Sequence, residues 1–287
     1  MMEIKKAVFP AAGFGTRFLP ATKAIPKEML PLVDKPLIQY VVEEAKLSGL
    51  QEIIIVTGMG KTAIEDHFDT SFELEKLLQE RGKYELLKMI EEVSGMVHFA
   101  YTRQKKPLGL GHAISITKNL INNEPFAVFL GDDIIDSRVP AMKQMIGVYN
   151  KHSTSVLAVQ RVPRSDARLY GIIKGKKVAP NIYRVIDLVE KPKGTPPSNL
   201  AIIGRYILTP GIFNALEVTR PGAGGEIQLT DALKILVQTE EIYACEFEGN
   251  RYDAGDKLGF LKANVSLALK RPDLRPAFIK FLKGLRL

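Results

Sequence analysis

The 287-residue sequence predicts an α/β fold, with a mixed, mostly parallel central sheet and helices on both faces. Three observations support this prediction. Short apolar segments rich in β-branched residues alternate with helical periodicities up to about residue 150. The composition, 46% hydrophobic and 25% charged, is typical of a globular chain and excludes disordered, collagen-like and coiled-coil classes. No apolar run reaches the roughly 18 residues that span a bilayer, so we expect a cytoplasmic protein without membrane contact.

The first half of the chain contains four segments that we expect to be strands buried on both faces. They are Lys6–Phe9, Glu52–Thr57, Val97–Tyr101 and Phe126–Leu130. Between the first two, residues 36–49 predict a helix, because proline opens the segment, five apolar residues recur on one face and glycine ends it. The order strand, helix, strand implies parallel pairing, with ligands outside the carboxyl ends of the strands.

After about residue 153 the chain becomes rich in strands, and no linker-like run separates the two halves. We therefore interpret the second half as an elaboration of the same sheet, with an antiparallel subregion. The expected strands are Ser155–Val162, Gly171–Lys174, Tyr183–Glu190 and Ala201–Leu208, and the expected helices are Gly211–Val218, Glu226–Thr239 and Asp256–Lys270.

The formal net charge of +8 is concentrated near the two ends of the chain. Residues 270–287 carry six basic side chains and one acidic one, and residues 1–35 carry six basic and three acidic ones. The residues between these two segments therefore have no net charge. Residues 275–287 predict an amphipathic helix. Its apolar side consists of Phe278, Ile279, Leu282 and Leu285. We expect this helix to dock onto the body or onto a second subunit; binding to an acidic lipid or polymer is the alternative.

The stretch from Pro10 to Pro20, directly after the first strand, contains two glycines followed by Arg17. Glycines after a strand let backbone N–H groups approach phosphates, and arginine offers a planar cationic fork. A dinucleotide fingerprint would require a third glycine where Phe18 stands and an acidic residue near the end of the second strand, and both are missing. The loop therefore favours a triphosphate, although a purely structural turn is also compatible with it.

Two further segments carry charges suited to a nucleotide and a metal. Lys27 lies between prolines close to the glycine loop and is a candidate phosphate ligand. Asp132 and Asp133 end the fourth strand, and we expect one to face the crevice and the other to face away. Mg²⁺ takes one or two protein carboxylates plus substrate phosphates, so a lone aspartate there fits it. Asp253 is a candidate second ligand, since Asp256 is suited to cap the following helix.

Taken together, the ordered motifs resemble the bacterial and archaeal UTP:glucose-1-phosphate uridylyltransferases, or UDP-glucose pyrophosphorylases. The matching segments are Gly13–Arg17, Lys23–Pro31, Pro107–Ala113, Gly131–Asp133, Val189–Pro192, Gly204–Tyr206 and Gly224–Asp231. The resemblance implies a glycosyltransferase-A-like nucleotidyltransferase fold that forms a single domain over residues 1–287. Within this domain we expect a nucleotide-binding part at residues 1–150, a sugar-phosphate-binding part at residues 151–255 and C-terminal helices at residues 256–287; the tail, residues 271–287, lies outside the resemblance.

The resemblance also implies a reaction, in which the uridylyl group of UTP passes to α-D-glucose 1-phosphate and gives UDP-glucose and pyrophosphate. It implies Mg²⁺ as the metal, a homo-oligomer (dimer or tetramer), and no nucleic-acid partner. The implied nucleotide contacts are Ala11, Ala12, Gly13, Gly15, Thr16, Arg17 and Lys27, with Gln104 and Gly109 at the uracil. The implied sugar-phosphate contacts are Gly171, Glu190, Lys191 and Gly204, and the implied metal ligands are Asp132 and Asp253. Catalysis is assigned on this basis to Arg17, Lys27, Asp132 and Lys191.

Three other functions remain open at this level. A Rossmann oxidoreductase would need the glycine and the ribose-binding acid that the sequence lacks. A non-catalytic nucleic-acid or nucleotide sensor would use the basic tail. A nucleotidyltransferase of the same fold could prefer another base or sugar. The uridylyltransferase reaction needs no general base, because a phosphate monoester is mostly dianionic at neutral pH.

Overall fold

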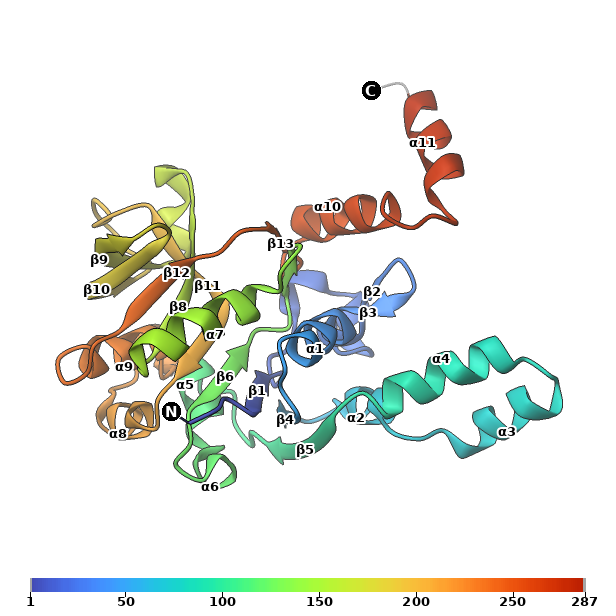
Figure 1. Ribbon diagram of the computed structural model, residues 1–287, viewed down its shortest axis with the longest axis horizontal. Coiled ribbons are helices and arrows are strands. Elements are labelled where there is room, and N and C mark those ends of the chain that lie inside the picture. Colours follow the sequence, from blue (N-terminus) through green and yellow to red (C-terminus); the bar gives the residue numbers. More distant parts are fainter. Residues whose placement is uncertain (1, 286–287) are drawn as a thin grey trace.

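The computed structural model describes residues 2–285 and has one mixed nine-stranded sheet at its centre (Figure 1). The strand order is β5-β4-β1-β6-β11-β8-β12-β10-β9. The first four strands in this order are parallel, and they are the four predicted from the first half of the sequence. Their bounds are β1 Lys6–Pro10, β4 Glu52–Thr57, β5 His98–Arg103 and β6 Phe126–Phe129.

The second half of the sheet contains the expected antiparallel subregion, in which only β8 and β12 pair in parallel. Its strands are β8 Val156–Arg161, β9 Gly171–Ala179, β10 Ile182–Glu190, β11 Leu200–Leu208 and β12 Tyr243–Glu246. Two small hairpins stand beside the main sheet. They are β2 Pro31–Leu32 with β3 Lys35–Pro36, and β7 Asp133–Asp136 with β13 Asn250–Asp253.

Helices cover both faces of the sheet, as predicted, and a hydrophobic cluster fills the space on each side. Helices α1 and α7 pack on one face, and α5, α8 and α9 pack on the other. The helices are α1 Leu37–Leu47, α2 Thr62–Phe68, α3 Phe72–Glu80, α4 Tyr84–Ser94, α5 Leu110–Ser115, α6 Lys118–Ile121, α7 Ala141–His152, α8 Gly211–Val218, α9 Leu229–Leu236, α10 Lys257–Ala268 and α11 Arg275–Gly284. No helix in the described part of the chain is long and apolar enough to cross a membrane.

The edge strand β5 and the C-terminal helix α11 differ in how well they match the sequence expectations. The prediction that Val97–Tyr101 is buried on both faces is wrong, because β5 is the edge strand of the sheet. Phe99 stacks on Phe68 with ring centroids 4.5 Å apart, but Tyr101 remains 39% exposed. The predicted tail helix forms as α11, and residues 286 and 287 of that prediction lie outside the described residues.

A fully buried arginine on β11 joins the sheet to the loop after β6. Arg205 donates to Oε2 of Glu44 on α1 at 2.7 and 3.1 Å, and to the backbone carbonyls of Leu130 at 3.1 Å and Asp133 at 2.8 Å. The other oxygen of Glu44 accepts from the N–H of Met142, 3.2 Å away at the start of α7. These bonds fix both ends of the three-residue segment between β6 and β7.

Replacing Arg205 with leucine should therefore be costly, because the Glu44 carboxylate would stay buried without a cation. We expect the free energy of unfolding to fall by about 3–5 kcal/mol in urea denaturation. The matched control is Arg161→Leu, which breaks a partly exposed 2.9 Å pair with Glu246 and should cost about 1 kcal/mol or less. An equal decrease in the free energy of unfolding in the two variants would contradict the role of Arg205 as the buried cation that compensates Glu44.

Candidate active site

The glycine loop follows β1 and turns at Gly15, whose φ of 66° is in the left-handed region that favours glycine. A Cβ at this position would lie 2.9 Å from Cβ of Lys27, so the residue also allows the two segments to approach closely. The hydroxyl of Thr22 donates to the carbonyl of Gly15 at 2.8 Å. The N–H of Ala11, where the loop begins, donates to the carbonyl of Val56 at 2.9 Å. The loop is thus held against Lys27, while Gly13, Thr16 and Arg17 stay exposed.

Lys27 and Asp132 form the first charged contact of the site, with 2.7 Å between Nζ and Oδ2. Burial works against the charge on Lys27, but Asp132 and Glu28 outweigh it and raise the pKa of the lysine. Burial likewise opposes the charge on Asp132, yet the Lys27 ammonium lowers the pKa of this carboxyl. Both groups are therefore charged at neutral pH.

A second ion pair fixes the segment that carries Lys27. Glu28 and Lys61 are both buried, and their Oε2 and Nζ atoms lie 2.6 Å apart. The other oxygen of Glu28 is the one buried side-chain N or O atom in residues 2–285 that lacks a hydrogen-bond partner. Glu28 is thus directed into the protein, while Lys27, on the same helical turn, reaches Asp132 at the crevice.

Asp132 and Asp253, the two predicted metal ligands, flank one point in the crevice. A Cβ on Gly255 would lie 2.8 Å from Oδ2 of Asp132 and 3.0 Å from Oδ1 of Asp253, so the absence of a side chain there leaves room between the carboxylates. Arg17 reaches the same place and donates to the carbonyl of Gly255 at 3.3 Å. Within the described residues no group of three or more His, Cys, Asp or Glu is arranged to hold a metal. Two carboxylates that leave positions for water and phosphate fit Mg²⁺.

Asp133 turns away from this point, as expected for the residue that follows Asp132. One of its oxygens accepts from the N–H of Gly204 at 2.9 Å, and the other is paired with Nε of Arg251. Arg251 also contacts Oδ2 of Asp253 at 3.2 Å. Burial and the charge of Asp133 raise the pKa of Asp253 despite this arginine, so bringing a cation to Asp253 would be favourable.

The residues expected at the sugar phosphate form another wall of the same pocket. Glu190 accepts from the hydroxyl of Thr230 at 2.7 Å, and its other oxygen lies 3.7 Å from Nζ of Lys191. Lys191 has a φ of 43°, and its N–H donates to the carbonyl of Tyr170 at 3.0 Å. A left-handed conformation is strained for lysine, and such strain tends to occur at functional sites.

One pocket of about 210 Å³ contains most of the predicted charged residues. The predicted site residues that line it are Arg17, Asp132, Asp253, Gly171, Glu190, Lys191 and Gly204. Lys27 lies beside this pocket and contacts Asp132, which lines it. Sequence reasoning missed Tyr170, Thr230 and Arg251, which also line it. Strand alternation could have indicated Arg251, because it shares a face of β13 with Asp253.

The residues expected at the base lie apart from that pocket, at the carboxyl end of β5. Gln104 is buried, and its amide donates to the carbonyl of Gly109 at 3.1 Å and contacts Nδ1 of His112 at 2.8 Å. Ala12, two residues after β1, is adjacent to Gly58, where an added Cβ would lie 3.1 Å from the Ala12 carbonyl oxygen. These residues surround the ends of the parallel strands, where ligands of such sheets bind.

Comparisons with known proteins agree with this geometry. Residues 6–269 match the family described as Nucleotidyl transferase. A UTP--glucose-1-phosphate uridylyltransferase of Staphylococcus epidermidis is 54% identical over 286 residues, which cover 99% of each chain.

Two solved structures are also similar. The UTP-bound UGPase of Acinetobacter baumannii has a TM-score of 0.92 at 40% identity, over 99% of this chain and 100% of the other. A UDP-glucose pyrophosphorylase in complex with UDP-glucose has a TM-score of 0.87 at 48% identity, over 94% and 100%. The chain therefore belongs to the nucleotidyl transferase family, among the bacterial UTP--glucose-1-phosphate uridylyltransferases.

Proposed function

We propose that this chain transfers the uridylyl group of UTP to α-D-glucose 1-phosphate and releases pyrophosphate. The observation that carries this proposal is the convergence of Arg17, Lys27 and two carboxylates, Asp132 and Asp253, beside the wall that contains Lys191. A reaction between two polyanions needs such a collection of charges, because the reactants repel each other at close range. The similar proteins bind UTP and UDP-glucose, which supports the same pair of substrates here.

In the proposed reaction a phosphate oxygen of glucose 1-phosphate attacks the α-phosphorus of UTP in line. A new oxygen–phosphorus bond forms, and the bond from the α-phosphorus to the bridging oxygen of pyrophosphate breaks. The nucleophile is already a dianion at neutral pH, so no proton must be removed. Lys27 and Arg17 bind triphosphate oxygens, and Lys191 binds the sugar phosphate. Catalysis then rests on positioning and charge neutralisation.

Members of the nucleotidyl transferase family typically use a divalent metal, and we propose Mg²⁺ held by Asp132 and Asp253. When bound, the ion would neutralise phosphate charge and orient the triphosphate. Arg251 keeps Asp253 in place, and Lys27 can exchange its pairing with Asp132 for phosphate oxygens.

The remaining predicted residues have distinct proposed roles. The backbone of the glycine loop binds phosphates, Gln104 and Gly109 bind the uracil, and Gly171, Glu190 and Gly204 shape the sugar-phosphate wall. This distribution agrees with a nucleotide-binding part in residues 1–150 and a sugar-phosphate-binding part in residues 151–255. The cytoplasmic location expected from the sequence stays a prediction.

The decisive test is a matrix assay in Mg²⁺ that crosses the four common nucleoside triphosphates with glucose, galactose, mannose and N-acetylglucosamine 1-phosphates. Pyrophosphate release should be fastest for UTP with glucose 1-phosphate, and mass spectrometry should identify UDP-glucose. Faster pyrophosphate release with dTTP or with another sugar 1-phosphate would show that the preferred substrates are others. The chain would then still be a nucleotidyltransferase. Release from no combination would reject the reaction itself.

Removing the carboxylate of Asp132 should stop turnover and leave the fold intact. We expect Asp132→Asn to lower kcat at least about 100-fold in saturating Mg²⁺, because a charged metal ligand is lost. The melting temperature should change little, since the amide still accepts a bond from Lys27. Asp187→Asn is the control, because Asp187 is a partly exposed carboxylate on β10 that pairs with Lys234. Unchanged turnover in Asp132→Asn would refute the metal assignment.

Lys191→Ala should weaken the binding of glucose 1-phosphate much more than the binding of UTP. We expect KM for glucose 1-phosphate to rise about ten- to a hundredfold, as for the loss of a charge-assisted hydrogen bond, while KM for UTP changes much less. Lys193→Ala removes a nearby exposed lysine and should leave both values unchanged. An equal rise of the two KM values would mean that Lys191 does not act on the sugar phosphate.

A further inference from the structure

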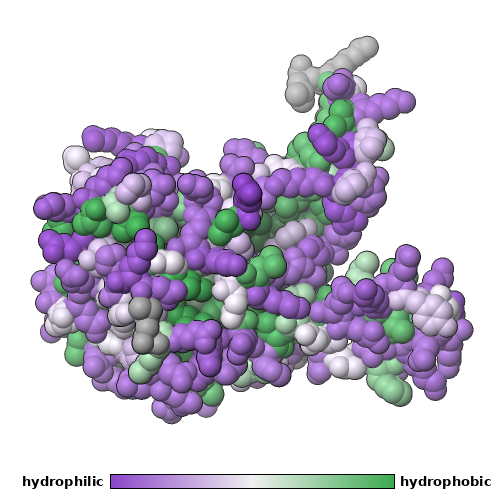
Figure 2. All heavy atoms as spheres, in the orientation of Figure 1, coloured by the Kyte–Doolittle hydropathy of each residue, from purple (hydrophilic) through white to green (hydrophobic). Residues whose placement is uncertain are grey.

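The side-chain amide of Gln104 is buried, yet its oxygen has no partner within the described part of the chain. Hydrophilic side chains predominate on the face of the molecule shown in Figure 2, and polar groups on such a surface are hydrated. Gln104 differs, because only 8% of it is exposed. Its Oε1 atom still reaches the surface, since the one buried side-chain N or O atom without a partner in residues 2–285 belongs to Glu28. The small accessible part of Gln104 therefore includes a hydrogen-bond acceptor.

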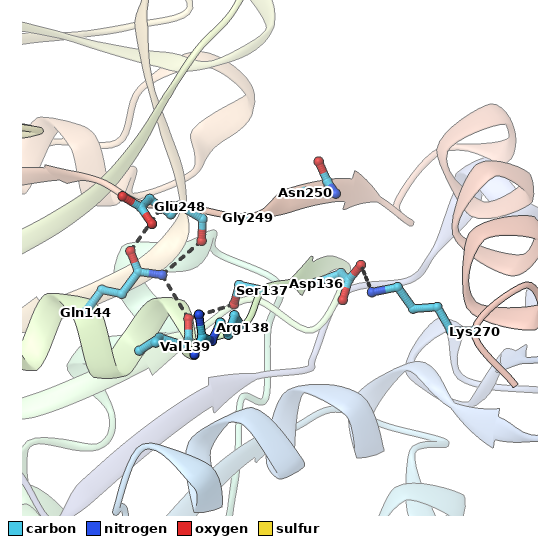
Figure 3. A pocket seen from close by; sticks show the side chains of 9 residues that line it. All are labelled: Asp136, Ser137, Arg138, Val139, Gln144, Glu248, Gly249, Asn250 and Lys270. Atoms are coloured by element: carbon cyan, nitrogen blue, oxygen red, sulfur yellow. Dashed lines mark hydrogen bonds and ion pairs between the residues drawn. The ribbon is translucent and has the colours of Figure 1, made fainter.

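A second glutamine shows the bonding of a purely structural amide. Gln144 lines a polar pocket of about 450 Å³ beside the β7–β13 hairpin (Figure 3). Its Nε2 atom donates to the carbonyls of Val139 at 2.8 Å and Glu248 at 2.9 Å, and its Oε1 atom accepts from the N–H of Glu248 at 2.9 Å. Gln104 has two such contacts at its nitrogen and lacks the third, so its oxygen is open to a ligand.

Both N–H groups of the Gln104 amide are used by acceptors at the start of α5. The Gly109 carbonyl, 3.1 Å away, identifies this corner of the amide as the nitrogen, because a carbonyl cannot donate. The same nitrogen lies 2.8 Å from Nδ1 of His112, so Nδ1 must accept and the imidazole carries its proton on Nε2. That ring nitrogen also reaches the surface, where water can accept from it.

The two acceptors have fixed positions. Gly109 precedes α5 with a φ of 95°, and its carbonyl also accepts the N–H of Ala113 at 3.1 Å, which begins the helix. A Cβ on Gly109 would lie 2.8 Å from the carbonyl oxygen of Ile227, so glycine lets this loop pack tightly. His112 follows on the first turn of the same helix. Turning the amide over would place its oxygen against two acceptors, so the oxygen keeps one direction.

This oxygen lies at the carboxyl ends of the parallel strands. Gln104 directly follows β5, and its backbone N–H donates at 2.9 Å to the carbonyl of Thr57, the last residue of β4. The glycine loop that we propose to bind the triphosphate follows β1, on the other side of β4. Strands β1 and β5 are thus about 10 Å apart, a distance that a nucleotide can span from its phosphates to its base.

We propose that His112 selects uracil over cytosine by holding the Gln104 amide with its oxygen toward the base. This inference rests on the proposed function, in which Gln104 binds the uracil of UTP. Uracil presents an N3–H donor on its Watson–Crick edge, whereas cytosine presents a lone pair at N3. A fixed acceptor bonds the first and opposes the second. His112 acts through Gln104 and is therefore a positioning residue.

Two substitutions of His112 test this role in the full chain. His112→Leu removes the acceptor but keeps a side chain of similar size, and His112→Asn can place Oδ1 where Nδ1 stands. The measurement is the ratio of kcat/KM for UTP to kcat/KM for CTP, from pyrophosphate release with glucose 1-phosphate and Mg²⁺. The wild type should favour UTP by at least about 100-fold. His112→Leu should lower this ratio at least about tenfold, because the amide can then turn toward cytosine, and His112→Asn should keep it within about threefold.

Two controls separate a loss of selection from general damage. The ratio of kcat/KM for UTP to that for dTTP should stay unchanged in every variant, because thymine has the same N3–H as uracil. His67→Leu is the matched substitution, since Nε2 of His67 makes a similar 3.1 Å contact with Oε1 of Gln39, between α2 and α1. It should alter neither ratio. If circular dichroism finds His112→Leu unfolded, His112→Met, which also lacks a strong acceptor, takes its place.

Three results would overturn the inference. They are an unchanged UTP-to-CTP ratio in His112→Leu, an equal loss of this ratio in His112→Asn, and an equal loss in His67→Leu. Calorimetric Kd values for UTP and CTP give the same ratio without turnover. If His112→Leu lowers the binding ratio but the wild type releases no pyrophosphate, the inference stands and the proposed reaction fails. If pyrophosphate is released and the wild type binds UTP no better than CTP, the reaction stands and the inference fails.

Discussion

The geometry of the site depends on a cation placed inside the core. Arg205 is fully buried and binds the carbonyls of Leu130 and Asp133, which lie on either side of Asp132 along the chain. Burying a guanidinium is costly unless its donors are satisfied, and here Glu44 and three carbonyls satisfy them. The position of the loop that presents Asp132 is thus determined by electrostatics within the core.

Charge pairing also positions the residues at the edge of the crevice. Asp133 meets Arg251, and Arg251 meets Asp253, so alternating charges lead from the core to the edge of the pocket. One arginine cannot compensate two carboxylates fully, and the pKa of Asp253 remains raised. The deficit of positive charge therefore lies beside Asp253, where a bound metal ion would offset it, whereas Asp132 is already paired with Lys27.

The sequence predicted the strands more readily than the contacts. β1, β4 and β6 are continuous apolar runs because helices bury both of their faces, and this pattern is local. The exposure of β5 follows from its place at the edge, which depends on pairing and not on its own residues. Arg205 and Arg251 were missed because their carboxylate partners are 161 and 118 residues away. Asp132 and Lys27 were predicted from their places at a strand end and near the glycine loop, Asp253 from its place before a helix cap, and Lys191 from the family resemblance.

The C-terminal helix α11 shows the same limit for surfaces. The periodicity of the tail predicted an amphipathic helix and a docking role, and the helix formed, but periodicity does not identify the partner. The basic tail and the acidic helices α3 and α4 are far apart in the sequence and project on the same side of the fold, and a pattern within one segment cannot show such a placement.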